Sequence, residues 1–261
     1  MENDFLFTWI SLVNVDKYTF IKLIQNNELE LQELYKLTMV PEKFSKYLIQ
    51  NDIFISKDLF QKFINKDLKE KSKYLFDYLV SNNFKIIHIF SKEYNQIFLN
   101  YEYSPIVVFL YGNYNLLKSK KTYIYKEKIS NENINKILNK IDDELINKNY
   151  TLIGNNSAFI CDKIEILNIN SVCIIKKLDS NKLYIFTDYN LIYTISSLID
   201  NLIIVNADYK KDIVFLVDII LESGKDIYVF PNNILDKNAY FSNYLISEGA
   251  KIVYNFKNLL N

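Results

Sequence analysis

The stretch LIIVNADYKKDIVFLVDIILESGKDIYVFPNNI, residues 202–234, decides the fold. It starts with an apolar run, crosses a short polar loop and continues with apolar residues at helical spacing over residues 211–222. Ser-Gly-Lys interrupts this pattern, and a second apolar run, DIYVF, ends at a Phe-Pro pair. Two apolar strands joined by a helix are typical of a parallel crossover unit, whose strands are buried on both faces.

The same alternation extends back to residue 84. Short apolar or β-rich runs follow one another as KIIHIF, PIVVFLYG, KTYIY, YTLIG, SVCIIKK, KLYIF, NLIIVNA, DIYVF and AKIVYN. Helical stretches at 131–147, 188–198, 211–222 and 240–248 separate several of them. The pattern predicts an α/β fold over residues 84–261, with a Rossmann-like, mostly parallel sheet and helices on both faces.

Residues 1–83 have a different pattern. They contain no glycine, and segments such as DKYTFIKLIQNN and PEKFSKYLIQNDIF place apolar residues three and four positions apart. Pro41 suits the first turn of a helix. We therefore expect a small all-helical domain at 1–83, preceding the Rossmann-like domain at 84–261.

Composition narrows the kinds of partner. The formal net charge is zero, so any nucleic-acid site must be a local patch. All 31 basic residues are lysines, which excludes bidentate guanidinium contacts with phosphate or guanine. Met1 is followed by acidic residues, and no apolar run approaches the roughly 20 residues of a membrane span. We expect a soluble, cytoplasmic protein that does not enter the membrane.

The C-terminal pattern resembles the DNA-processing family DprA, also called Smf. That family has a strand ending V-x-A, then S-G-S-L and a helix, then G-[RK]-x-V-[FY]-x-V-P-G and G-x-N-x-L-I-x-x-G-A. The residues in matching places are Val205, Ala207, Gly224, Lys225, Tyr228, Pro231, Asn243, Leu245, Ile246, Gly249 and Ala250. Gly249 also falls where a helix must end and the chain must turn, a position that favours a left-handed residue.

Two upstream segments extend the resemblance over about residues 84–255. KEYNQIFLNYEYSPIVVFLYGNYNLL is similar to the family's entry segment, and FTDYNLI lies where the family has F-P-x-R-N-R-I-I. The matching residues are Tyr94, Phe98, Pro105, Leu110, Gly112, Phe186, Asn190 and Ile192. The family's G-[ST]-R after the first sheet strand has no counterpart in YIYKEK at 123–128, and its S-G turn is replaced by Lys211-Asp212. These departures remove glycines and arginines that suit contacts with phosphate.

The resemblance implies a protein that binds single-stranded DNA, hands it to the RecA recombinase in transformation or recombination, and forms a homodimer through the Rossmann domain. It implies binding without bond-making. We expect the winged-helix tail of some members to be absent, because the chain stops soon after Asn255. Two alternatives remain open. One is a degenerate paralogue that keeps the fold as a protein-interaction module, and the other is a small nucleotide-binding or hydrolysing Rossmann protein.

The strongest candidate for DNA binding is the basic segment LLKSKKTYIYKEK, residues 116–128. Its lysines can neutralise phosphates and its tyrosines can stack on unpaired bases, although a solvated strand end has the same composition. The candidate residues here are Lys118, Lys120, Lys121, Tyr123, Lys126 and Lys128. Tyr189, Asn190 and Asn232 are further candidates, with a helix start and a turn as the structural alternatives.

No pattern indicates catalysis. His88, the only histidine, lies in an apolar run, and we expect a core or edge residue rather than a base. The carboxylates at 142–144 and the pair Asp162 and Glu165 are expected on solvated helix faces. Cys161 and Cys173 are expected to be core thiols, since two cysteines without a CxxC pair form neither a disulfide framework nor a metal site. We therefore expect no enzymatic activity, no metal and no cofactor.

Overall fold

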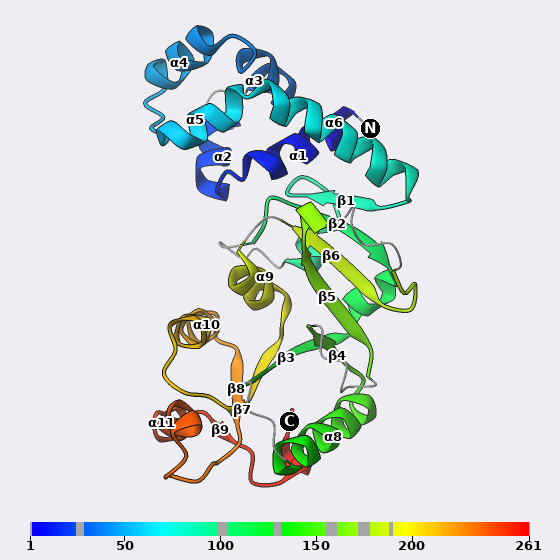
Figure 1. The fold of residues 1–261 in the computed structure, drawn as a ribbon, viewed down its shortest axis with the longest axis vertical. Coiled ribbons are helices and arrows are strands. Elements are labelled where there is room, and N and C mark those ends of the chain that lie inside the picture. The colour runs from blue at the N-terminus through cyan, green and yellow to red at the C-terminus, as the bar shows by residue number, and fades with distance from the viewer. Residues whose placement is uncertain are drawn as a thin grey trace. The chain divides into compact units, whose positions relative to one another are not determined.

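Figure 1 shows the computed structural model of the chain. It describes residues 2–24, 29–98, 104–127, 132–154, 161–171, 178–187 and 190–260, without the side chains of residues 2, 95, 96, 170 and 238. The chain folds into two compact units. Unit 1 comprises Met1–Tyr111, Leu167–Lys177 and Ile185–Tyr189. Unit 2 comprises Gly112–Ile166, Leu178–Tyr184 and Asn190–Asn261. The expected domain boundary between residues 83 and 84 stays a prediction.

The N-terminal part of unit 1 is helical, as predicted. Its helices are α1 (Glu2–Val13), α2 (Lys17–Ile24), α3 (Leu31–Leu37), α4 (Pro41–Gln50), α5 (Lys57–Ile64) and α6 (Lys66–Ser81). Pro41 lies in the first turn of α4, where its missing N–H breaks no helical hydrogen bond. The core contains Trp9, which is fully buried and lies edge-on to the rings of Tyr35 at 4.9 Å and Phe63 at 5.8 Å.

A short antiparallel pair follows the helices. Strand β1 (Lys85–His88) pairs with β2 (Val107–Gly112), and the short helix α7 (Tyr94–Ile97) lies between them in sequence. β1 is an edge strand, and the His88 ring stacks on Phe7 with 3.9 Å between ring centroids. Burial lowers the pKa of His88, with opposing contributions from Asp4 and Glu93. His88 is therefore a packed edge residue, as the apolar run predicted.

The described residues form one sheet in the order β1-β2-β6-β5-β4-β3-β7-β8-β9. The further strands are β3 (Lys120–Lys126), β4 (Tyr150–Ile153), β5 (Lys163–Asn168), β6 (Leu183–Thr187), β7 (Asn201–Asn206), β8 (Asp226–Val229) and β9 (Lys251–Ile252). From β5 through β4, β3, β7 and β8 to β9, every neighbouring pair is parallel. This confirms the predicted α/β fold with a mostly parallel sheet.

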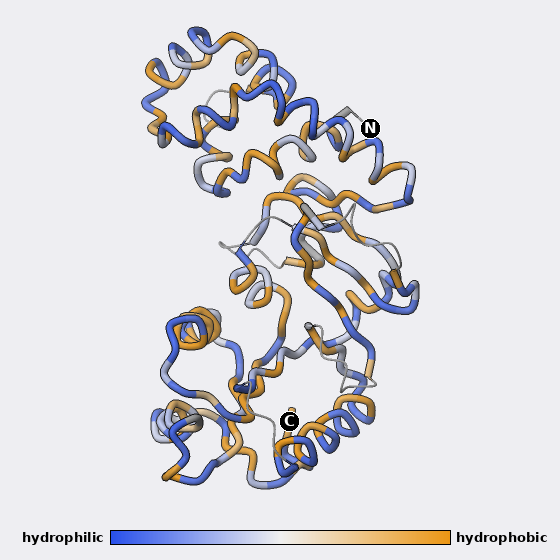
Figure 2. The backbone as a smooth tube through the Cα atoms, in the orientation of Figure 1, coloured by the Kyte–Doolittle hydropathy of each residue, from blue (hydrophilic) through white to orange (hydrophobic). Residues whose placement is uncertain are grey.

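Helices cover both faces of the sheet in unit 2. They are α8 (Glu132–Asn147), α9 (Leu191–Leu198), α10 (Lys211–Glu222) and α11 (Tyr240–Ser247), and α8 lies across the strands from the other three in Figure 1. The hydrophobic stripe of α8 is visible in Figure 2 and packs with Ile203 and Val205 of β7. Leu202 and Ile204 alternate with these residues and are fully buried, so they face the opposite layer of helices.

Two expectations about acidic residues are wrong. Glu165 lies on strand β5, where it is buried and its carboxylate is 2.7 Å from the Lys182 ammonium. Asp142 is on a helix, as expected, but it is buried and accepts a hydrogen bond from the Cys161 N–H at 2.9 Å. The sequence missed β5 because its charged residues interrupt the apolar run, and only the paired lysine makes the burial of Glu165 tolerable. The expected strand SVCIIKK falls largely on residues 172–177, outside the described residues, and so does Cys173.

Candidate nucleic-acid interface

The connections of the sheet in unit 2 diverge between β3 and β7. These strands are parallel neighbours, but the chain leaves β3 through α8 to reach β4 on one side, and leaves β7 through α10 to reach β8 on the other. The loops after the two strands therefore separate. In open α/β sheets, ligands bind at the carboxyl ends of the strands at such a switch point.

A buried carboxylate lies at this switch point. Glu127 follows β3 directly, is 5% exposed, and forms an ion pair with Lys210, the residue before α10. Its carboxylate also accepts hydrogen bonds from the Tyr125 hydroxyl at 3.2 Å and from the Asp208 N–H at 3.4 Å. The Glu127 N–H donates to the side-chain oxygen of Asn206 at 3.1 Å, which joins the two strand ends. Burial together with the negative charge of Glu127 raises the pKa of Tyr125 to about 12.

Three exposed tyrosines gather beside the switch point, and we call Tyr209, Tyr240 and Tyr244 the tyrosine platform. Their exposed fractions are 49%, 62% and 43%. The ring of Tyr209 is 6.0 Å from that of Tyr240 and 5.6 Å from that of Tyr244. The rings of Tyr209 and Tyr244 contact buried Phe241, at centroid distances of 4.7 and 6.2 Å. The platform thus presents aromatic surface to solvent while its base is fixed in the core.

Backbone contacts hold the platform at the end of β7. The N–H groups of Phe241 and Ser242 donate to the carbonyl of Ala207 at 3.0 and 3.2 Å. The Ser242 hydroxyl in turn accepts from the Ala207 N–H at 2.7 Å. The start of α11 is therefore attached to the residue that follows β7, and this brings Tyr240 next to Tyr209.

Charges of both signs surround the platform. Lys210 and Lys211 precede and begin α10, and Lys237 lies in the turn before α11. Lys126 ends β3, next to Asn206 of β7. Asp208, Asp212 and Asp236 lie in the same loops and turns, so the edge has little net charge. A ligand here would gain aromatic contacts and a few individual lysines rather than a strong positive field.

The structure does not bring the predicted basic segment together as one patch. Lys118, Lys120 and Lys121 lie at the amino end of β3, whereas Lys126 lies at its carboxyl end. A strand of seven residues separates these ends by roughly 20 Å. Lys128 lies outside the described residues.

The side chains at the amino end are engaged locally. The Lys121 ammonium donates to the carbonyls of Leu117 at 3.1 Å and Ser119 at 2.8 Å, and burial lowers its pKa. Lys120 lies over the Tyr150 ring at 5.8 Å. Tyr123 is half-buried, and burial raises the pKa of its hydroxyl. These contacts support the edge of the sheet and leave less of each side chain for a ligand.

The predicted asparagines also have structural partners. The Asn190 side chain caps α9 by accepting a hydrogen bond from the Ile192 N–H at 2.9 Å. The Asn232 amide donates to the carbonyls of Val205 and Phe230, each at 2.8 Å. Asn243 closes the loop by accepting from the Asn232 N–H at 3.1 Å. Tyr189 falls outside the described residues.

Sequence reasoning missed the tyrosine platform. A usable signal was present, because Tyr209 follows the buried strand β7 and Tyr240 begins the helix after the Phe-Pro loop. Both positions lie at carboxyl ends of parallel strands, where ligand contacts are common. The lysine-rich segment drew attention instead, because charge is visible in a sequence whereas exposure is not.

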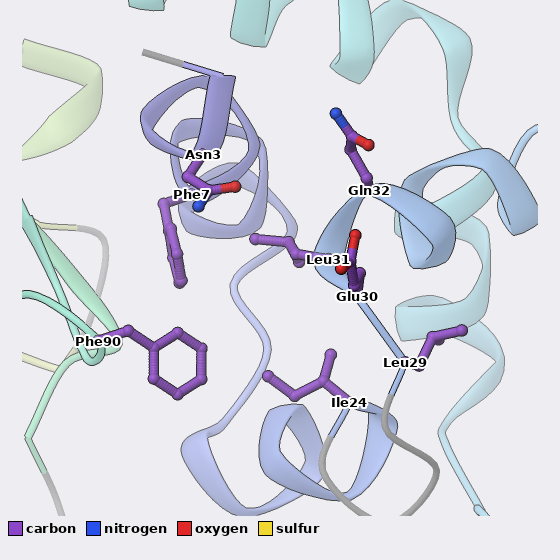
Figure 3. A pocket seen from close by; sticks show the side chains of 8 residues that line it. All are labelled: Asn3, Phe7, Ile24, Leu29, Glu30, Leu31, Gln32 and Phe90. Carbon is purple, nitrogen blue, oxygen red and sulfur yellow. The ribbon is translucent and has the colours of Figure 1, made fainter.

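A separate cavity lies in unit 1. It has a volume of about 600 Å³, and Figure 3 shows the side chains around it: Asn3, Phe7, Ile24, Leu29, Glu30, Leu31, Gln32 and Phe90. The walls are mainly apolar, and the only charge on them is the Glu30 carboxylate. No lysine lines the cavity among the described residues, so it does not suit a phosphate group.

Two further observations concern metals and membranes. The described part of the chain contains no group of three or more histidine, cysteine or acidic side chains that could hold a metal ion. Within the same part, none of the helices is both long and apolar enough to cross a membrane. Cys161 is buried, and its pKa is raised mainly by that burial and further by its hydrogen bond to Asp142. Its thiol is therefore not primed as a nucleophile.

Comparison with known proteins rests on structure. No protein-family model matches the chain, and no curated protein matches it either. The structure is similar to that of DNA processing protein A (DprA) from Streptococcus pneumoniae, with a TM-score of 0.57 and 16% identity over 87% of this chain and 95% of that one. It is also similar to DprA from Helicobacter pylori, described for its single-stranded DNA binding mode, with a TM-score of 0.52 and 15% identity. That match covers 67% of this chain and 93% of the other.

Three of the glycines that suggested the family in the sequence lie at the ends of elements. Gly112 ends β2, Gly224 follows α10, and Gly249 follows α11, each at a break between elements of the sheet. At these levels of identity, the likeness establishes the arrangement of the elements. The protein described here has a DprA-like fold.

Proposed function

We propose that the protein is a DprA-like DNA-processing protein that binds single-stranded DNA at the carboxyl edge of the parallel sheet in unit 2. The observation that carries the proposal is the tyrosine platform, exposed beside a topological switch point. The DprA-like fold supports it, and the H. pylori neighbour is a single-stranded DNA binder. The proposed mechanism is binding, with no bond made or broken.

The chemistry of the platform suits unpaired bases. Aromatic side chains stack on every base, so they hold single strands with little sequence preference. Without arginine in the chain, phosphate contacts must come from lysines and backbone N–H groups. Besides Lys210, which is paired with Glu127, the lysines Lys126, Lys211 and Lys237 lie near the strand ends and the platform in sequence. We assign them to the phosphates.

The test is a binding titration with a fluorescent oligo-dT at about 50 mM salt, where phosphate contacts are strongest. We expect the double variant Tyr209→Ala/Tyr240→Ala to lose about tenfold or more in affinity, since two stacking rings are removed. Tyr74→Ala is the matched control, because Tyr74 is 76% exposed on α6 of unit 1. Absence of binding by the wild-type protein at this salt would refute the proposal. An equal loss of oligo-dT affinity in Tyr74→Ala would show that the platform is not the binding site.

The finer parts of the proposal follow from the family resemblance. We propose that the bound strand is handed to RecA, that the protein forms a homodimer and that it acts in the cytoplasm in transformation or recombination. Light scattering during size-exclusion chromatography tests the dimer, and a monomer at all concentrations would exclude it. RecA assembly on DNA coated with a single-strand-binding protein tests the hand-over, which requires faster assembly when this protein is added.

A second function is favoured by a different observation. Ile234 and Leu235, in the loop after β8, are 81% and 85% exposed. Exposed aliphatic side chains near a platform of little net charge suit a protein partner. The degenerate paralogue, acting as a protein-interaction module, therefore remains the alternative. Charged substitutions at both positions that leave oligo-dT binding intact would separate this surface from the DNA site.

A further inference from the structure

The ion pair of Glu127 and Lys210 joins a buried carboxylate to an exposed lysine at the carboxyl ends of the strands. The Glu127 carboxylate is almost fully buried, whereas the Lys210 side chain is 55% exposed. The carboxylate also accepts hydrogen bonds from the Asp208 N–H and the Tyr125 hydroxyl. We call Glu127, with its contacts to Lys210 and the Asp208 N–H, the Glu127 latch.

The latch occupies the place where an anion would bind. It lies between the carboxyl ends of β3 and β7, just before the first turn of α10. A lysine ammonium and a backbone N–H ahead of a helix are the groups that hold phosphate in many α/β proteins. Here both donate to a carboxylate of the same chain. The donors are therefore neutralised without a ligand.

We propose that Glu127 is an internal occupant of this anion position, and that a DNA phosphate binds Lys210 only after the carboxylate has moved away. The proposal rests on the proposed function, because it describes how the same edge is regulated. In the closed state, with Glu127 paired to Lys210, DNA contacts the tyrosine platform and the outer lysines but not Lys210. In the open state, with the Glu127 carboxylate moved away, Lys210 adds one contact with a DNA phosphate beside Tyr209.

A substitution at Glu127 separates these states. Glu127→Gln keeps the size of the side chain and its ability to accept a hydrogen bond, but removes the charge that holds Lys210. We expect oligo-dT to bind about fivefold or more tightly to this variant. We also expect the slope of log affinity against log salt to become steeper by about 0.7, the value for one added phosphate contact on a single strand. A purely structural role of Glu127 would not change this slope.

The chain offers a matched control in Glu165→Gln. Glu165 is also 5% exposed and is also paired with a lysine, Lys182, but it lies on β5, which is separated from β3 by β4. Both variants change the net charge equally. If the proposal holds, Glu127→Gln binds oligo-dT more tightly than the wild type and Glu165→Gln does not. The gain in affinity must also disappear in the double variant Glu127→Gln/Lys210→Gln. Unchanged affinity in Glu127→Gln, or an equal gain in Glu165→Gln, overturns the proposal.

A second probe distinguishes failure of the latch from failure of the proposed function. Inorganic pyrophosphate has no bases to stack, so a thermal shift with it reports the anion position alone. If no variant binds oligo-dT but pyrophosphate stabilises Glu127→Gln and not the wild type, the latch stands and the DNA function fails. If the wild type binds oligo-dT and Glu127→Gln binds neither probe more tightly, the latch fails and the function stands. Should Glu127→Gln not fold, Glu127→Asp, which retracts the carboxylate by one methylene, must show a smaller gain with both probes.

Discussion

At the scale of single residues, Gly112 shows how a glycine can be required for space as well as for backbone conformation. Its φ is +108°, and a Cβ atom at this position would lie 2.0 Å from the carbonyl oxygen of Lys182. The same carbonyl accepts a hydrogen bond from the Asn113 N–H at 2.9 Å. Gly249 has a similar φ of +100°, but no atom beyond its two chain neighbours lies within 4 Å of the position that a Cβ would take. Both glycines are therefore required by their backbone conformation, but only Gly112 is also required for space.

This difference predicts unequal costs for the same substitution. We expect Gly249→Ala to lower the free energy of unfolding by about 1–2 kcal/mol, from the backbone conformation alone. Gly112→Ala should cost about 3 kcal/mol or more, because the Lys182 backbone must also move. Urea denaturation of both variants measures the two losses. Equal losses would show that the close approach at Gly112 is relieved without cost.

Lys69 is a buried lysine in the helical part of unit 1. Its ammonium lies over the rings of Trp9 at 5.8 Å and Tyr35 at 5.1 Å from their centroids, and the exposed fraction of Lys69 is 5%. Burial, with a smaller contribution from Lys66, lowers its pKa to about 8. The ammonium is thus disfavoured in the folded state, despite the favourable contacts with the two rings.

We expect Lys69→Met to raise the free energy of unfolding by about 1–2 kcal/mol at neutral pH, since a buried charge is replaced by an apolar chain of similar shape. The gain should shrink as pH rises from about 8 to about 10.5, because the folded wild type releases the proton before the unfolded chain does. Lys73→Met, at an exposed position of the same helix, is the control. A gain that does not depend on pH over this range would contradict the explanation.

At the scale of elements, the start of α9 depends on one side chain. The Asn190 side chain accepts a hydrogen bond from the Ile192 N–H at the first turn of α9. Farther along, α9 packs on α10 through Tyr193 and Phe215, whose ring centroids are 5.3 Å apart. We expect Asn190→Ala to lower the free energy of unfolding by about 1 kcal/mol while leaving oligo-dT affinity unchanged. Asn190→Ser should retain the cap and the stability. A loss of DNA affinity in both variants, measured by the same titration, would instead make Asn190 a ligand-binding residue.

Individual elements also show how far local sequence pattern reaches. The helix at residues 211–222 has the predicted bounds, because its apolar residues recur at helical spacing between a polar loop and Ser-Gly. Strand β5, with the sequence KIEILN, escaped prediction because Lys163 and Glu165 break its apolar run. The pairing of Glu165 with Lys182, 17 residues away, is a tertiary contact that no local pattern contains.

At the scale of the whole molecule, zero net charge limits the electrostatic part of DNA binding. The lysines assigned to phosphate are Lys126, Lys211 and Lys237. Three contacts with a single strand predict a slope of about −2 for log affinity against log salt, or about a 20-fold loss between 50 and 200 mM salt. Titrations at several salt concentrations measure the slope. A slope steeper than about −4 would indicate a larger basic surface than the edge of unit 2 provides.

The sequence by itself determined the α/β class, the helical N-terminal part and the likeness to DprA, because these depend on periodicity and on glycines and apolar residues at fixed spacings. The tertiary structure alone decided where the candidate site lies. It placed Lys120 and Lys126 at opposite ends of β3, and it brought Tyr209 and Tyr240 together from segments on either side of β8. It also buried Glu127 against Lys210, 83 residues away. Neighbours of this kind arise from the order of strands in the sheet, and that order is set by packing of the whole chain rather than by any segment of it.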